Sequence, residues 1–202
     1  MLTYPEYAAA LFDALRPDPF YRTLEEAYPD PAGARDAMLR YYDLSIREGA
    51  EWGRLGEPQN GAYGVSVWSV PLTPEEARRK QAAKEKGLVA AMGEACARTF
   101  AKIEAAMAEH EARLGLDGHW YLSILGVSPS VQGQGLGGGL LKPVLAQADA
   151  AGVSSYLTTF TPRNIPFYER QGYAVAGQFP EPTTGSEFTV LVRRPHALSA
   201  TR

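Results

Sequence analysis

A dense run of glycine between two apolar segments is the part of the chain best suited to bind a ligand. Five of the seven residues from 133 to 139 are glycine, and they follow the apolar stretch WYLSILGV at 120–127. The first N–H groups of a helix lack partners within the helix, and the helix dipole favours negative charge there, so such a loop can cradle a phosphate. One or two glycines would suit a tight turn alone, whereas five favour an anion-binding loop.

The spacing of the glycines in the loop can be compared with three known nucleotide-binding patterns. Gly133, Gly135 and Gly138 satisfy the dinucleotide pattern G-x-G-x-x-G, but the strand does not run directly into the first glycine. The acidic ribose ligand expected about 20 positions later is missing, because that stretch reads SSYLTTFT. The lysine and hydroxyl residue of a P-loop do not follow the glycines either. Gln132, Gly135 and Gly137 do fit the spacing Q/R-x-x-G-x-G/A.

A second block, PRNIPFYERQGY at 162–173, carries Asn164, Tyr168 and Gly172. From its pattern alone, Tyr168 would be a core aromatic residue on a short amphipathic helix.

Together, LGVSPSVQGQGLGGGLL and PRNIPFYERQGY resemble the motifs of the GNAT superfamily of acetyl-CoA-dependent N-acetyltransferases. The likeness is greatest with the small-molecule branch that includes puromycin N-acetyltransferase. It implies an α/β (α+β) fold: a mixed, mainly antiparallel central sheet with helices on both faces, and two parallel strands that splay apart at the cofactor site, the first of them bulged. It also implies a single domain over 1–202, with a helical substrate-side region at 1–117 and an acetyl-CoA-binding core at 118–195.

The resemblance further implies the chemistry of the site. Acetyl-CoA would be the cosubstrate, and the amine of a small molecule would attack its thioester directly. Backbone near Leu125 and Val127 would bond to the pantetheine arm, the glycine loop would hold the pyrophosphate, and Tyr168 would be the catalytic acid. The cofactor-binding residues implied in this way are Leu125, Val127, Gln132, Gly133, Gln134, Gly135, Leu136, Gly137, Gly138, Asn164 and Tyr168.

Two positions depart from the pattern of the relatives. Some GNAT enzymes place a glutamate base on the strand before the loop, where this chain has Tyr121, a poor base near neutral pH. The neighbouring His119 is an alternative, although a lone histidine is more often a structural or surface residue. Puromycin-type relatives often carry a glutamate in a stretch LETS, where this chain reads LTTF with Thr158. The identity of a general base therefore stays open.

Composition narrows the other function classes. The chain has 202 residues, a formal net charge of −3 and no basic stripe, so we expect no nucleic-acid partner. No metal-ligand cluster or nucleophile motif is visible, and the single cysteine, Cys96, lies on an apolar stripe where a buried thiol is expected. With no membrane-spanning stretch or signal peptide, we expect a cytoplasmic protein with no membrane partner. Two other functions stay open: a protein or peptide N-acetyltransferase, and a non-catalytic acetyl-CoA-binding module. The oligomeric state, which includes a homodimer, also stays open.

Periodicity and capping signals predict the elements that position these motifs. We expect a first helix at 5–15, a second that is capped by Asp30 and runs to about Glu48, and a long third that opens with a Thr73–Glu76 capping box and that glycine interrupts. Further helices are expected after the glycine loop and at 164–172. The expected strands lie at 51–57, 62–70, 120–127, 153–161, 173–179 and 187–194.

The N-terminal third of the chain is rich in aromatic residues, most of which we expect in the core and a few in an acceptor pocket. Glu25, Glu26 and Asp30 are the acidic residues that the sequence places near them. A solvated surface suits these three carboxylates better than a binding site. We therefore expect a partly apolar amine as acceptor rather than a highly cationic one.

Overall fold

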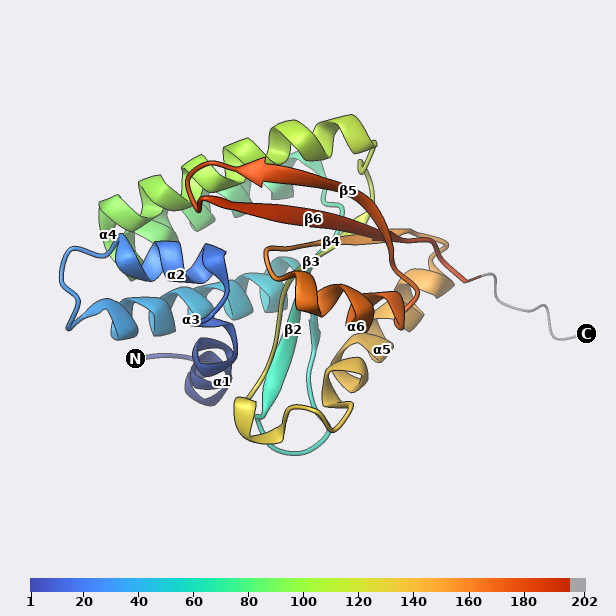
Figure 1. Ribbon diagram of the computed structural model, residues 1–202, viewed down its shortest axis with the longest axis horizontal. Helices are drawn as coiled ribbons and strands as arrows, with labels where there is room; N and C mark the ends of the chain where they lie inside the picture. Colours follow the sequence, from blue (N-terminus) through green and yellow to red (C-terminus); the bar gives the residue numbers. More distant parts are fainter. Residues whose placement is uncertain (197–202) are drawn as a thin grey trace, which may run out of the picture.

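A computed structural model describes residues 1–196 as a six-stranded sheet covered by helices (Figure 1). The strands lie in the order β1-β2-β3-β4-β6-β5, with β3 and β4 parallel and every other neighbouring pair antiparallel. The predicted mixed, mainly antiparallel sheet is therefore confirmed. The strands are β1 (Gly53–Gly56), β2 (Gly64–Ser69), β3 (Trp120–Val127), β4 (Ser155–Thr159), β5 (Ala174–Glu181) and β6 (Ser186–Arg193).

Six α-helices flank the sheet, with short 3₁₀ turns at Ala112–Leu114, Pro129–Val131 and Pro162–Asn164. Figure 1 shows α1, α2 and α3 grouped together beside α4, and α5 and α6 lying together away from them. The helices are α1 (Pro5–Leu15), α2 (Pro19–Glu26), α3 (Ala34–Trp52), α4 (Pro74–Glu111), α5 (Leu136–Ala150) and α6 (Ile165–Glu169).

Two apolar clusters form the core, one on each face of the sheet. The larger joins α1 to α4 with inward side chains of the strands, among them Val67, Ile124 and Phe188. The smaller joins α5 and α6 with side chains of the opposite face, among them Trp68 and Leu157. Burying each such side chain contributes about 1.5–3 kcal/mol, so both helical layers are held on the sheet mainly by apolar contact.

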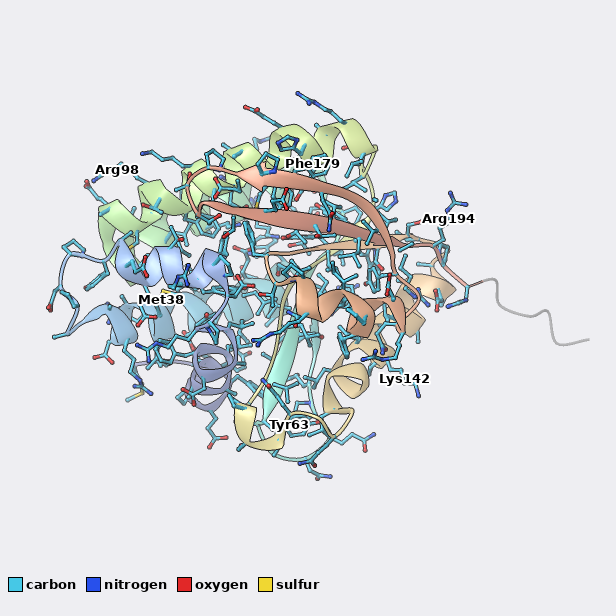
Figure 2. The ribbon with its side chains drawn as sticks, viewed as in Figure 1. Met38, Tyr63, Arg98, Lys142, Phe179 and Arg194 are labelled. Carbon is cyan, nitrogen blue, oxygen red and sulfur yellow. The ribbon has the colours of Figure 1, made fainter. Side chains whose placement is uncertain are left out.

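The long helix α4 begins as predicted and is interrupted at a glycine. The Thr73 hydroxyl accepts the N–H of Glu76 at 3.3 Å, and the Glu76 carboxylate accepts the N–H of Thr73 at 2.9 Å. Gly93 has φ 75°, a left-handed conformation that a residue with a side chain rarely adopts, and it breaks the helical path. The second half of α4 lies over the sheet, where the ring of Phe179 (Figure 2) stacks on His110 with ring centroids 4.5 Å apart.

Two helical boundaries in the N-terminal third differ from the prediction. The helix expected to start after Asp30 begins at Ala34, because the Asp30 carboxylate closes a local turn by accepting the N–H of Ala32 at 3.1 Å. That helix also runs past Glu48 to Trp52 and leads directly into β1. The helix α2 was not predicted. It is capped by Asp18, whose carboxylate accepts the N–H of Phe20 at 3.0 Å.

Buried polar residues tie the helical layer together. The carboxylate of Asp43 on α3 accepts the N–H groups of Thr3 and Tyr4, each at 2.7 Å, and anchors the segment that precedes α1. Cys96 is buried as predicted, and burial raises the pKa of its thiol. Within the described residues, none of the helices combines the length and apolar character needed to cross a bilayer.

Candidate functional site

The candidate site begins where β3 and β4 separate. The two strands pair at three positions, Trp120–Leu122 with Ser155–Leu157, although β3 continues to Val127. The parallel pair that diverges toward its C-terminal end, expected from the family resemblance, is confirmed. Beyond Leu122, the edge of β3 that faces β4 has no strand partner in the described range, so its backbone polar groups are available to a ligand.

A bulge in β3 accompanies this separation. In the register with β2, Val67 faces Ile124 and the next residue, Trp68, faces Leu122, so Ser123 is the extra residue of β3. The Ser123 hydroxyl donates to the carbonyl oxygen of Val67 at 3.0 Å and fixes the bulge. Leu122 and Ile124 consequently pack in the two different core clusters, although they are only two positions apart.

The glycine loop connects the end of β3 to α5. The amide of Gln132 donates to the carbonyl oxygen of Val127 at 2.8 Å and ties the loop to the strand. Gly135 is the residue before the helix and has φ 75°, and Gly133 has φ 80°, so both need glycine for their backbone conformation. The N–H of Gly138 already donates to the carbonyl oxygen of Gly135 at 3.2 Å. The N–H groups at the start of α5 that stay open to an anion therefore come from residues before Gly138.

A groove of about 690 Å³ collects most of the predicted cofactor-binding residues. Gln134 and Gly138, also predicted, do not line it. Arg163 and Arg170 do line it and were not predicted; two arginines beside open N–H groups suit a ligand with several phosphate charges. The predicted residues that line the groove are Leu125, Val127, Gln132, Gly133, Gly135, Leu136, Gly137, Asn164 and Tyr168.

A second cavity, of about 270 Å³, lies on the α1–α4 side of the sheet. Four carboxylates line it, from Asp18, Glu48, Glu104 and Glu111, together with one basic residue, Lys84. The Lys84 ammonium lies 3.8 Å from the Glu104 carboxylate and 4.9 Å from the centroid of the Phe100 ring. The aromatic residues that line the cavity are Phe20, Tyr21, Tyr41, Phe100, Tyr121, Tyr156, Phe160 and Tyr168.

Glu25, Glu26 and Asp30 lie outside this cavity, as expected from the sequence, but four other carboxylates line it, which was not expected. Glu25 pairs with Arg16 at 3.4 Å and Glu26 with Arg22 at 3.7 Å, and neither lines the cavity. Asp30 closes its own turn. Acidic residues do gather near the aromatic residues, but they come from α3, α4 and the start of α2, which only the tertiary structure brings together.

The two cavities meet at a wall that we call the junction, defined by the residues that line both. The junction residues are Leu15, Asp18, Leu125, Asn164 and Tyr168. The ring of Tyr168 is buried and packs edge-on against Phe167 and Tyr173. Burial, with smaller contributions from Tyr173 and Asp18, raises the pKa of the Tyr168 phenol, so this hydroxyl keeps its proton at physiological pH.

The position expected for a base on β3 is unsuited to that role. The Tyr121 hydroxyl lies 3.1 Å from the hydroxyl of Thr158, and its ring stacks on Tyr156 with centroids 4.7 Å apart. Burial and the nearby Glu104 and Glu111 raise the pKa of Tyr121 well above its usual range. His119 does not line either cavity. The two positions compared with glutamates in the sequence analysis thus hold a tyrosine and a threonine whose hydroxyls face each other.

Glu111 is a titratable group that the sequence reading missed. Burial and the neighbouring Glu104 raise the pKa of its carboxyl to about 7, although the Tyr156 hydroxyl donates to it at 3.4 Å. No sequence motif marks Glu111, because it is the last residue of an otherwise ordinary amphipathic helix. No group of three potential metal ligands occurs within residues 1–196.

Comparison with known proteins identifies related folds. The acetyltransferase (GNAT) family model matches residues 72–173, about half of the chain. The structure resembles the histone acetyltransferase HPA2 and related acetyltransferase of Corynebacterium glutamicum, with a TM-score of 0.66 and 22% identity over 98% of this chain and 93% of that one. It also resembles PH1933 of Pyrococcus horikoshii, with a TM-score of 0.52 and 14% identity over 95% and 92% of the two chains. At these identities the likeness shows the fold alone.

A curated relative matches a shorter stretch. A probable serine/threonine-protein kinase of Dictyostelium discoideum is 32% identical over 79 residues, which is 38% of this chain and 11% of that protein. This chain therefore spans a small part of that relative, and the name of the relative describes the whole of a much longer protein.

The raised pKa of Glu111 predicts a pH-dependent cost to stability. The carboxyl has an ordinary pKa of 4.5 and a folded-state pKa of about 7, so the folded state holds the proton more tightly and loses stability as pH rises from 4.5 to 7. Glu111→Gln should match the wild type near pH 4 and exceed it at pH 8 by on the order of 2 kcal/mol. Urea unfolding at both pH values measures this difference.

The control for this prediction is Glu109→Gln, which changes an exposed glutamate on the same helix. It should leave the pH dependence of unfolding as in the wild type. If the Glu111→Gln and wild-type stabilities change in parallel between pH 4 and pH 8, Glu111 does not carry a raised pKa.

The loop geometry predicts a charge effect on cofactor binding. Gly135→Asp and Gly135→Asn impose the same left-handed strain, which these two residues tolerate better than most, and no atom lies within 4 Å of the added Cβ. Only the aspartate places a negative charge beside the open N–H groups. Calorimetry should therefore show that the aspartate variant binds acetyl-CoA about ten- to a thousandfold more weakly than the asparagine variant. Equal affinities of the two variants would contradict an anion site at this loop.

Proposed function

Because the chain belongs to the GNAT acetyltransferase family, we propose that it transfers the acetyl group of acetyl-CoA to the amine of a small molecule. The observation that carries this proposal is the junction. A groove with a glycine loop and two arginines meets a second, aromatic and acidic cavity at Tyr168. Two ligands that enter from opposite sides would come together there.

The groove fits the chemistry of coenzyme A. The unpaired edge of β3 near Leu125 offers backbone hydrogen bonds of the kind that the amides of a pantetheine arm can make, whereas the Val127 carbonyl oxygen already accepts the side-chain amide of Gln132. The N–H groups before Gly138 and the side chains of Arg163 and Arg170 offer positive potential for phosphates. The thioester of acetyl-CoA, which supplies the activated acetyl group, would then lie at the junction.

The second cavity supports a small, partly apolar amine as acceptor. It is lined by aromatic rings and is small enough to exclude a folded protein segment, while its carboxylates favour a cationic ligand. Within the family we place the chain with the small-molecule branch that includes puromycin N-acetyltransferase. The Thr158–Tyr121 pair, where relatives of that branch often have a glutamate on β4, points to a different acceptor from theirs.

In the proposed reaction, the amine nitrogen attacks the acetyl carbonyl and the thiolate of coenzyme A leaves. Tyr168 gives its proton to the departing sulfur. Its buried phenol stays protonated before the reaction, and its burial strengthens its interaction with a developing negative charge. Holding both reactants at the junction contributes the remaining rate enhancement through proximity.

Tyr168→Phe should lower kcat while leaving acetyl-CoA affinity unchanged, because it removes an interaction made only in the transition state. The expected loss is about ten- to a thousandfold. The matched control is Tyr173→Phe, which removes the hydroxyl that lies 3.0 Å from Ser155 and that does not line either cavity. That control should reduce stability rather than kcat. A Tyr168→Phe enzyme with full kcat would leave Tyr168 as a packing residue.

An acceptor panel tests the proposal as a whole. Release of free thiol from acetyl-CoA is followed with small aromatic amines, small aliphatic amines, aminoglycosides, and peptides with free N-termini or lysines. We expect the highest kcat/KM with a small aromatic or aliphatic amine. A kcat/KM at least about tenfold higher for peptides would show a protein or peptide acetyltransferase, and acetyl-CoA binding without turnover on any amine would show a non-catalytic module.

A further inference from the structure

The proposed reaction needs a group that takes a proton from the attacking amine. As the C–N bond forms, the nitrogen becomes positively charged and its proton becomes acidic. Tyr121 and Thr158 face each other and provide no carboxylate for this purpose. Glu111 lines the acceptor cavity but not the junction, so it does not lie where the two ligands meet.

Asp18 is the one charged residue among the five that form the junction. It faces both cavities from the turn between α1 and α2, and Tyr168 lines the same wall from α6. The remaining junction residues, Leu15, Leu125 and Asn164, cannot accept a proton near neutral pH. The position of Asp18 therefore places a carboxylate beside the point where an amine would meet a thioester.

The Asp18 carboxylate is held in a fixed orientation. One oxygen accepts the N–H of Phe20 at 3.0 Å, and the other accepts the hydroxyl of Thr161 at 2.7 Å. A carboxylate has about four acceptor positions, so two of them stay free for an amine. In the described part of the chain, no ion pair joins Asp18 to a lysine or arginine.

The surroundings of Asp18 hold the pKa of its carboxyl above the ordinary value for aspartate. Burial raises the pKa of Asp18, while the hydrogen bonds from Thr161 and Phe20 and the charge of Arg163 lower it to a smaller extent. The other titratable groups that interact with Asp18 are the phenols of Tyr21, Tyr42 and Tyr168, all of which stay neutral because their own pKa values are raised.

We propose that Asp18 is a catalytic residue that binds the acceptor amine at the junction and takes its proton as the C–N bond forms. The inference rests on the proposed function. The amine lone pair forms the C–N bond, the C–S bond breaks with its electron pair on sulfur, and sulfur takes the proton of Tyr168. The amine proton moves to Asp18 and returns through water to the Tyr168 oxygen. The net change is amine plus thioester to amide plus thiol.

Asp18→Asn tests this role with little disturbance of the fold, because asparagine caps a helix about as well as aspartate and retains an oxygen for the Phe20 N–H. We expect kcat/KM for the acceptor to fall by about a hundred- to a thousandfold, with acetyl-CoA affinity unchanged. The matched control is Asp36→Asn, which removes an exposed carboxylate that lies in the first turn of α3 and lines neither cavity.

The pH profile separates a catalytic role from a structural one. If ionised Asp18 is required, kcat/KM of the wild type falls at low pH because this carboxyl takes up a proton. The kcat/KM of Asp18→Asn should not show that fall. The ratio of the two profiles on one acceptor cancels the ionisation of the acceptor itself. Thr161→Val removes a hydrogen bond that lowers the pKa of Asp18, so it should move the low-pH loss to higher pH.

These measurements use whichever amine of the panel reacts fastest, small or peptide. A preference for peptides would overturn the proposed function and leave the Asp18 comparison intact on that peptide. If Asp18→Asn has the same kcat/KM and the same pH profile as the wild type, the proposed role of Asp18 is overturned. If Asp18→Asn does not fold, Thr161→Val decides, because it retains the Phe20 cap: an unshifted low-pH loss overturns the role, and a shift to higher pH supports it.

Discussion

The separation of β3 from β4 is the constraint on which the rest of the site depends. Hydrogen-bonding groups of a strand edge must find partners, and beyond Leu122 those of β3 face a gap rather than β4. The Ser123 bulge fixes the point at which this begins and turns the following side chains to the opposite face of the sheet. Leu125 and Val127 follow this bulge and line the groove, and Leu125 also belongs to the junction of the two cavities.

The acidic character of the second cavity is a second consequence of the tertiary arrangement. Glu48 comes from α3, Glu104 and Glu111 come from α4, and Lys84 offsets part of their charge from the other half of α4. Because the cavity is partly enclosed, its negative field is less screened than that of surface carboxylates and favours the entry of a cation. The cavity thus combines the aromatic lining expected from the sequence with an acidic lining that was not expected.

Local signals predicted the fold well wherever the sequence determined structure by itself. The helix at 5–15, the α4 capping box and the strand at 120–127 were predicted correctly, because periodicity and capping residues there agree with the tertiary fold. The sequence contains two Asp-Pro pairs, at Asp18 and Asp30, and a helix was expected after the second pair only. Gly33 two residues after the second Pro favours a turn, whereas Phe20 directly after the first Pro begins a buried helical face.

The candidate site could be predicted only in part, because local sequence signals identify residues that lie close together along the chain. The glycine loop and Tyr168 lie in contiguous motifs, so their type and spacing could be read directly. Asp18 and Thr161 are 143 positions apart, and the carboxylates of the second cavity come from separate helices that become neighbours only when the larger core cluster forms. No pattern within a short window encodes such neighbours, and a single sequence therefore predicted the residues that line the groove better than those that line the second cavity.

The shared wall between the two cavities also has a consequence for ligand design. Under the proposed function, a conjugate that joins the sulfur of coenzyme A to an acceptor nitrogen through a short linker would occupy the groove and the acceptor cavity together. Once one half is bound, the other is present at an effective concentration on the order of millimolar, so the affinities of the two halves reinforce each other. The linker would have to pass the junction, where Leu125 and Tyr168 limit its length and its thickness.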